Sequence, residues 1–269
     1  MADEFDGPDE PLVLVSDFDG TLYRGDAPIR YYAEQAAAGL PRDERAALLA
    51  GVEHYLAEGV AAADSTTDPV RAAAFRAAVD GWEVVAQLGR QRHGLGAAEL
   101  DSAFAATRVH MATPACELEV PTGYAELLAE LRAHGVRVVL ATNSPAAGLA
   151  ELLTRLEVQP LVDEVISSTG KPAGLRRLLR AELGLAAGPE AERDTRVGAA
   201  ERILSIGDHW HNDVAPAAEL GAPCAYIDRF GRADGPATAV GVRIEELLPA
   251  LRAWAAAPLG RATAPAERN

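Results

Sequence analysis

Residues 13–23 read VLVSDFDGTLY, the most informative stretch of this 269-residue chain. The apolar run at residues 12–15 is typical of a strand that is buried on both faces of a sheet. Two acids, Asp17 and Asp19, follow this run at once, and Gly20 then lets the backbone turn tightly. We therefore expect a buried strand that carries two carboxylates to the edge of a sheet.

The two carboxylates pose an electrostatic problem. Asp17 and Asp19 are one residue apart, so their charges repel, and keeping both ionised beside a sheet is costly. A bound Mg²⁺, which keeps several waters and takes one or two carboxylates, would remove that cost. An ordinary polar turn at Asp19-Gly20 would explain the same residues without a ligand. Other parts of the chain are therefore needed to distinguish a metal site from a turn.

The composition limits the class of protein. Hydrophobic residues make up 49% and charged residues 24% of the chain, which predicts a well-filled core. The formal charge of -15 argues against nucleic acid or an anionic membrane as the main partner, because both need a basic surface. A small phosphorylated metabolite needs only a local positive pocket, so it stays open as a partner.

Sequence signals for a compartment are few. The two cysteines, Cys116 and Cys224, offer neither a disulfide framework nor metal-ligand spacing. The N-terminus is acidic without an apolar signal segment, and no apolar run has the length of a membrane span. We therefore expect a cytoplasmic protein, and its oligomeric state is left open.

A helical segment interrupts an alternating pattern. Residues 29–113 are rich in Ala with apolar residues at helical spacing, and we predict helices after residues 41–44 and over residues 69–90 and 97–111. From residue 121 onward, helices alternate with strands. The strands are predicted at residues 136–141, 164–167, 202–206 and 224–227, and the helices at 124–134, 146–156, 173–183, 212–220 and 244–254. Such alternation predicts a parallel sheet with helices on both faces.

Polar clusters follow three of these strands where plain turns would suffice. They lie at Asp17, at Thr142 and at Asp208. In a parallel sheet, ligands bind at the carboxyl ends of the strands, so we expect the three clusters to meet at one edge. Taken singly, each has an ordinary explanation as a turn or as a helix cap.

In chain order the clusters form four short motifs. They are Asp17-Phe18-Asp19-Gly20-Thr21, Thr142-Asn143, Lys171-Pro172, and Gly207-Asp208 with Asp213. This ordered set resembles the four motifs of the haloacid dehalogenase-like superfamily, and the helical segment resembles that family's α-helical cap. The resemblance implies an α/β fold, with a Rossmann-like three-layer core around a parallel sheet plus an all-helical cap domain. We place the core at residues 1–24 and 117–269 and the cap at residues 25–116.

The resemblance also implies a catalytic pair. Asp17 would be the nucleophile that attacks phosphorus to form an aspartyl-phosphate. Asp19 would act as a general acid toward the leaving oxygen and then as the base that activates water. In the dehalogenase branch the second position is not an acid, so Asp19 favours phosphoryl transfer over dehalogenation.

The remaining motif residues would handle charge. The phosphate-binding residues implied by the resemblance are Gly20, Thr142, Asn143 and Lys171. Of these, Thr142 and Lys171 also count as catalytic, because they would stabilise the transferred phosphoryl group.

Four acids would hold Mg²⁺. They are Asp17, Asp208, Asp213 and Asp19, the last through its backbone carbonyl. Asp213 would bind the metal directly or through water. A zinc site at His209 and His211 is disfavoured, because the neighbouring ligands are hard oxygens.

The sequence therefore predicts a Mg²⁺-dependent phosphatase that hydrolyses a small phosphomonoester. Two alternatives stay open: a phosphomutase or phosphotransferase with the same intermediate, and a non-catalytic binding protein that keeps the fold. Possible substrate contacts in the helical segment are His54, Trp82, Arg90, Arg92, His93 and His110.

Overall fold

The computed structural model describes residues 11–185 and 199–257. The predicted core includes residues 1–10, 186–198 and 258–269, which lie outside the described residues. Within the described ranges, no helix is both long enough and apolar enough to cross a membrane.

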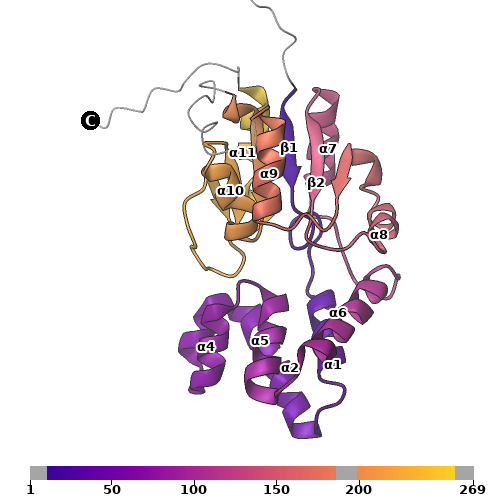
Figure 1. Cartoon of the computed structure of the whole chain (residues 1–269), viewed down its shortest axis with the longest axis vertical. Coiled ribbons are helices and arrows are strands. Elements are labelled where there is room, and N and C mark those ends of the chain that lie inside the picture. The colour runs from indigo at the N-terminus through magenta and orange to yellow at the C-terminus, as the bar shows by residue number, and fades with distance from the viewer. Residues whose placement is uncertain (1–10, 186–198, 258–269) are drawn as a thin grey trace, which may run out of the picture.

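One sheet of six parallel strands forms the centre of the molecule (Figure 1). The strand order is β3-β2-β1-β4-β5-β6. The strands are β1 (Val13–Ser16), β2 (Arg137–Ala141), β3 (Glu164–Ile166), β4 (Ile203–Gly207), β5 (Cys224–Ile227) and β6 (Ala239–Gly241). Because β1 lies between β2 and β4, the acids that follow it emerge at the middle of the carboxyl edge. The predicted strands are confirmed, and β6 is an edge strand of three residues that is too short for a pattern to reveal.

Alternate residues of each strand face opposite layers. Leu14 packs with α7 (Tyr124–Ala133), α8 (Leu149–Arg155) and α11 (Leu248–Ala256). Its neighbours Val13 and Val15 pack on the other face with α9 (Ala173–Glu182) and α10 (Ala215–Ala218). This two-residue period buries both faces of the sheet and confirms the Rossmann-like three-layer core.

A unit made of helices lies beyond the carboxyl ends of the strands (Figure 1). Its members are α1 (Ala27–Ala36), α2 (Arg42–Glu58), α3 (Ala62–Ser65), α4 (Pro69–Ala77), α5 (Gly81–His93) and α6 (Ala97–Met111). The unit has its own apolar cluster around Tyr55 and Phe75, and Phe230 from the core side joins it. An isolated antiparallel bridge between Arg24 and Glu119 ties together the two chain segments that connect the units. The boundaries at residues 25 and 116 stay a prediction.

The single helix predicted over residues 69–90 is wrong. The chain forms α4 and α5 instead, with an extended residue, Ala78, after α4. The side chain of Asp80 accepts a hydrogen bond from the backbone N–H of Glu83 at 2.7 Å and so begins a new helix. An N-cap aspartate followed by glycine favours a helix start over a continuous helix, and this local signal outweighs the apolar spacing.

The helix predicted over residues 212–220 is also wrong in its bounds. The segment is a π-helical turn at Trp210–Val214 followed by the short α10. Asp213 accepts a hydrogen bond from the backbone N–H of His209 at 3.0 Å, which pulls the first turn out of regular α geometry. The helices predicted at 146–156 and 244–254 begin later, at Leu149 and Leu248.

Candidate active site

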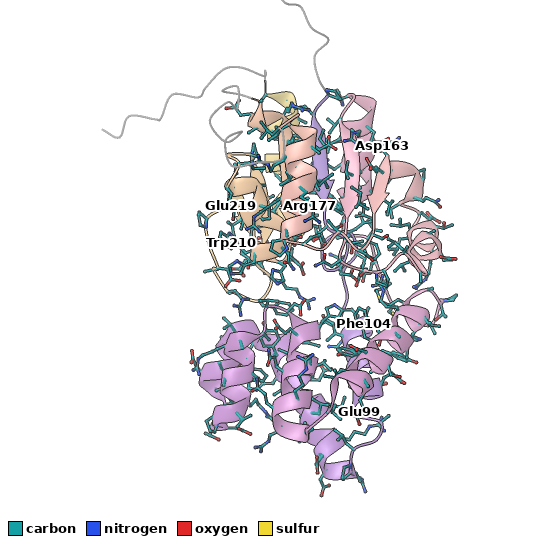
Figure 2. The ribbon with its side chains drawn as sticks, viewed as in Figure 1. Glu99, Phe104, Asp163, Arg177, Trp210 and Glu219 are labelled. Atoms are coloured by element: carbon teal, nitrogen blue, oxygen red, sulfur yellow. The ribbon has the colours of Figure 1, made fainter. Side chains whose placement is uncertain are left out.

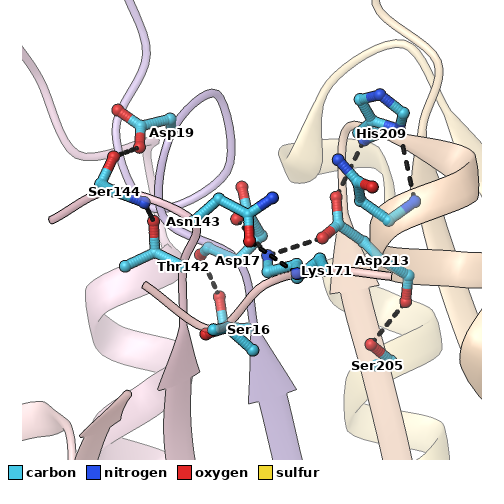
Figure 3. Close-up of polar contacts among 12 residues, drawn as sticks. Ser16, Asp17, Asp19, Thr142, Asn143, Ser144, Lys171, Ser205, His209 and Asp213 are labelled. Carbon is cyan, nitrogen blue, oxygen red and sulfur yellow. Dashed lines mark hydrogen bonds and ion pairs between the residues drawn. The ribbon is translucent and has the colours of Figure 1, made fainter. Parts of the chain in front are cut away.

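Lys171 joins two of the predicted acids at the carboxyl edge of the sheet (Figure 3). Its Nζ donates to Asp17 Oδ1 at 2.5 Å and to Asp213 Oδ1 at 2.7 Å. The three side chains are almost fully buried, with 3% of the Lys171 side chain exposed. Charge-assisted hydrogen bonds of this length in a buried site fix the positions of both carboxylates.

Lys171 is the only lysine of the chain, against 24 arginines. A compact ammonium can donate to two carboxylates from one atom, whereas the planar guanidinium of Arg needs more room and a different geometry. A single Lys in a chain whose other basic residues of this kind are all Arg indicates that position 171 needs an ammonium group, and the motif analysis missed this signal.

A third acid completes a metal-competent group. Ligand atoms of Asp17, Asp208 and Asp213 all lie within 4.8 Å of one another. Two glycines make this approach possible. A Cβ on Gly20 would lie 2.1 Å from Asp208 Oδ2, and a Cβ on Gly207 would lie 2.3 Å from the Cβ of Asp213. Gly20 also has φ +80°, so any other residue there would add backbone strain to the clash.

The electrostatics of the group favour a bound cation. Burial, together with the charges of Asp213 and Asp19, raises the pKa of Asp17 to about 7 against the opposing effect of Lys171. Burial and the neighbouring acids also raise the pKa of Asp208 well above its ordinary value. Burial would lower the pKa of Lys171, but the charges of Asp17 and Asp213 raise it above its usual range. One ammonium thus faces three carboxylates, which leaves excess negative charge.

Asp19 points away from that group and toward Ser144 (Figure 3). Its Oδ1 accepts from the Tyr23 hydroxyl at 2.7 Å and from Arg108 Nη1 at 2.8 Å. Its Oδ2 accepts from Ser144 Oγ at 2.6 Å. Arg108 belongs to α6 of the helical unit and has 7% of its side chain exposed, so this ion pair spans the two units.

Thr142 and Asn143 stabilise the loop that follows β2 and the loop that carries Lys171. Thr142 is buried, and its Oγ1 accepts from the backbone N–H of Ser144 at 3.0 Å. Asn143 Oδ1 accepts from the backbone N–H of Lys171 at 2.7 Å and so fixes the loop that presents the lysine. Both residues therefore stabilise the loops beside Lys171, and their contact with phosphate stays a prediction.

A cavity of about 250 Å³ opens in front of these side chains. The core lines it with Asp17, Asp19, Thr142, Asn143, Lys171, Asp208 and Asp213. Every predicted site residue except Gly20 thus lines this cavity, and Gly20, which lies against Asp208, lines a neighbouring cavity of about 380 Å³. The role of Gly20 in phosphate binding stays a prediction.

A family comparison agrees with this arrangement. Residues 12–221 match the model of the haloacid dehalogenase-like hydrolases, which is well over half of the chain. The chain belongs to the haloacid dehalogenase-like hydrolase family. Among curated proteins, none matches the sequence.

Solved structures of haloacid dehalogenase-like proteins share the fold of this hydrolase. One is a predicted phosphoglycolate phosphatase from Haemophilus somnus, with 16% identity, a TM-score of 0.59, and coverage of 91% of this chain and 100% of that one. A family hydrolase from Deinococcus radiodurans with bound phosphate and sodium has 21% identity, a TM-score of 0.53 and coverage of 91% and 97%. An L-2-haloacid dehalogenase has 19% identity, a TM-score of 0.52 and coverage of 90% and 99%. At these identities the likeness shows the fold alone.

The donor set of this hydrolase fits a hard divalent cation. The described residues that could hold a metal together are carboxylates, and oxygen ligands suit Mg²⁺ rather than a soft metal. His209 Nδ1 accepts a weak hydrogen bond from the backbone N–H of Asn212 at 3.3 Å, while Trp210 Nε1 donates to the carbonyl of Pro236. His209 lines the 250 Å³ cavity, whereas Trp210 lines neither cavity and holds its loop to the segment at Pro236.

The helical unit contributes residues that the sequence did not single out. Asp80 and Phe104 line the 250 Å³ cavity together with Trp82, the one predicted cap contact that reaches it. The other predicted cap contacts line neither cavity: His54, Arg90, Arg92, His93 and His110. Arg108 carried no signal, because its partner Asp19 lies 89 residues away. Asp80 did carry one, since an aspartate before Gly81 and Glu83 predicts a helix start.

Proposed function

We propose that this hydrolase is a Mg²⁺-dependent phosphatase of small phosphomonoesters that acts through an aspartyl-phosphate on Asp17. The observation that supports it most is the bridge from Lys171 to Asp17 and Asp213 beside Asp208, at the floor of a cavity. Phosphoryl transfer depends mainly on positioning and on charge stabilisation, and these residues supply both.

In the first step, a carboxylate oxygen of Asp17 forms a bond to phosphorus while the bond from phosphorus to the ester oxygen breaks. Protonated Asp19 gives its proton to the departing alcohol oxygen. The hydroxyls of Tyr23 and Ser144 and the guanidinium of Arg108 hold the Asp19 side chain in place for this transfer.

In the second step, water attacks phosphorus and the bond to the Asp17 oxygen breaks. Asp19, now ionised, takes the proton of the attacking water, which restores it as an acid for the next cycle. Phosphate leaves, and Asp17 returns to a carboxylate. Lys171 neutralises Asp17 and the phosphoryl oxygens throughout, with Thr142 and the backbone N–H of Asn143 as further donors.

Asp17, Asp208 and Asp213 would hold the metal with their carboxylates, and Asp19 with its backbone carbonyl. A bound Mg²⁺ would supply positive charge to the phosphoryl oxygens and offset the repulsion among the acids. The partner in this proposal is a small phosphorylated metabolite, and a cytoplasmic location stays a prediction.

The direct test is phosphate release by the purified chain from a panel of phosphomonoesters. We expect turnover with Mg²⁺, loss of turnover to the uncatalysed background with excess chelator, and recovery when Mg²⁺ is restored. The panel should include a 2-haloacid, from which we expect no halide release, since Asp19 supplies an acid for an alkoxide leaving group. If labelled phosphate is transferred to an added alcohol rather than to water, the protein is a phosphotransferase and not a phosphatase.

The raised pKa values predict how stability depends on pH. With the pKa of Asp17 raised to about 7 and that of Asp208 raised also, the folded state holds more protons than the unfolded state between pH 5 and 7. Stability must then fall as pH rises through this window, by up to about 1.4 kcal/mol per pH unit for each such carboxyl. The Lys171 pKa lies above the window, so the lysine stays charged and does not reverse the slope.

Urea denaturation at pH 5, 6 and 7 with chelator present would measure this slope. We expect the free energy of unfolding to drop by about 2 kcal/mol from pH 5 to 7 through Asp17 alone, and Asp208 should add to this drop. Asp17→Asn should flatten the curve, and Mg²⁺ should stabilise the protein more at pH 7 than at pH 5. A free energy of unfolding that rises with pH between 5 and 7 would contradict the predicted charge balance.

A further inference from the structure

The helical unit presents a distinctive wall to the proposed active site. This wall consists of Asp80, Trp82 and Phe104. Trp82 and Phe104 pack edge to face with ring centroids 5.5 Å apart, and Figure 2 shows Phe104 at the end of the unit that faces the core. An organic group in the cavity would therefore meet two aromatic surfaces and one carboxylate.

The organic part of a substrate has room to extend past this wall. The 380 Å³ cavity shares Asp80, Trp82 and Asp208 with the 250 Å³ cavity, so the two spaces adjoin there. The larger cavity is lined mostly by apolar side chains, such as Ile29 and Phe230. Its volume is large enough for a leaving group of several carbon atoms.

Arginines line the larger cavity, but acids already neutralise them. Arg24 pairs with Glu119 at 3.0 Å and also with Glu245. Arg229 pairs with Asp26, and Arg243, the third arginine of this lining, pairs with Glu246 at 3.6 Å. A carboxylate on the substrate would have to compete with these acids for a cation.

Asp80 differs from those acids. Its side chain accepts from the backbone N–H of Glu83 as an N-cap, and no ion pair joins it to a basic side chain in the described part of the chain. Asn or Ser would cap the helix about equally well, so capping does not require the charge. Burial raises the pKa of Asp80, and the charges of Glu83 and Asp19 add to this, whereas the hydrogen bond from the Glu83 backbone and the charge of His209 lower it. Asp80 thus shares the cavity lining with Asp19 and Asp208, and His209 is the one basic side chain that lines this cavity near it without forming an ion pair with it among the described residues.

We infer that Asp80 selects the substrate by the charge of its leaving group. The substrate class is a phosphomonoester whose alcohol part carries a hydrogen-bond donor, a hydroxyl or an ammonium, and no carboxylate. Asp80 accepts from that donor and repels a carboxylate in the same place, while Trp82 and Phe104 pack on the carbon skeleton. This inference rests on the proposed phosphatase function.

Three two-carbon phosphates of nearly equal size test the charge rule. They are phosphoethanolamine, 2-hydroxyethyl phosphate and phosphoglycolate, whose leaving groups are cationic, neutral and anionic. We expect kcat/KM for the first two to exceed that for phosphoglycolate by about tenfold or more, because a like charge within a few ångströms of Asp80 costs more than 1.4 kcal/mol.

The decisive variant is Asp80→Asn, which keeps the cap and removes the charge. It should reduce the ratio of kcat/KM for phosphoethanolamine over phosphoglycolate by about tenfold, mainly through faster reaction of phosphoglycolate. Asp80→Ser, another neutral N-cap, should behave alike if the Asn variant folds poorly. Asp68→Asn is the control for an Asp-to-Asn change at an N-cap, since Asp68 caps α4, pairs with Arg92 at 3.1 Å and lines neither cavity.

The outcomes separate the two levels of the proposal. The role of Asp80 would be overturned if the wild type hydrolyses these esters but Asp80→Asn changes the ratio of kcat/KM for phosphoethanolamine over phosphoglycolate no more than Asp68→Asn does. The proposed phosphatase function would then still hold. A wild type that prefers phosphoglycolate would also overturn it. Failure to hydrolyse any phosphomonoester with Mg²⁺ would overturn the proposed function and this inference with it.

Discussion

Asp17→Asn is expected to lower kcat on any accepted phosphomonoester by about 10⁴-fold or more, because it removes the attacking oxygen itself. The amide is nearly isosteric with the carboxylate, so the buried site should keep its shape. It can still accept a hydrogen bond from Lys171 Nζ, which lies 2.5 Å from Asp17 Oδ1. Steady-state rates with Mg²⁺, together with the search for a phosphorylated enzyme in rapid-quench experiments, measure the effect.

Measurements of the stability of Asp17→Asn show whether its loss of kcat comes from the missing nucleophile or from a damaged fold. In chelator at pH 7 and above, we expect Asp17→Asn to be at least as stable as the wild type, because the raised pKa of Asp17 means that its charge costs stability there. Asp68→Asn should keep full activity as the control for an Asp-to-Asn change. If Asp17→Asn retained turnover, another residue would have to be the nucleophile.

The second large effect is expected at Lys171. Lys171→Met leaves two buried carboxylates, Asp17 and Asp213, without their shared cation. We expect a loss of about 10³-fold in kcat, as for the removal of a transition-state charge partner. Without metal, the free energy of unfolding should drop by about 3 kcal/mol, the usual cost of leaving a buried charge unpaired.

Two further variants test whether the effect of Lys171→Met comes from the loss of a compact cation between two buried carboxylates. Lys171→Arg keeps the charge but not the compact shape, and its activity should remain low, because a guanidinium does not fit a site with donor distances of 2.5 and 2.7 Å. Combining Lys171→Met with Asp17→Asn should recover much of the lost stability, since the second change removes one of the unpaired charges. Full activity of the Arg variant would show that any positive charge suffices there.

The core of the fold was predictable because its signals are local. An apolar strand that ends in polar residues buries the same way in any parallel sheet, so Asp17, Thr142 and Asp208 had to reach one edge. The ordered motifs then indicated the family, which the family match confirmed. Helix boundaries were less secure, since the caps at Asp80 and His209 depend on side-chain hydrogen bonds that apolar spacing does not reveal.

Contacts between distant segments were beyond such reasoning. Nothing near Arg108 in the sequence announces that it reaches Asp19, because the pairing depends on how α6 lies against the core. The same holds for the wall formed by Asp80, Trp82 and Phe104, whose members come from two helices.

The order of residues alone therefore determined which acids follow which strands, and that a single lysine accompanies them. Those features follow from strand burial, which is a property of short segments. Tertiary packing decided the surroundings of those residues, namely the ion pair between Arg108 and Asp19 and the position of Asp80 in the cavity lining. Such contacts arise only when segments far apart in the sequence pack together, and their energies depend on the distances and burial that this packing creates.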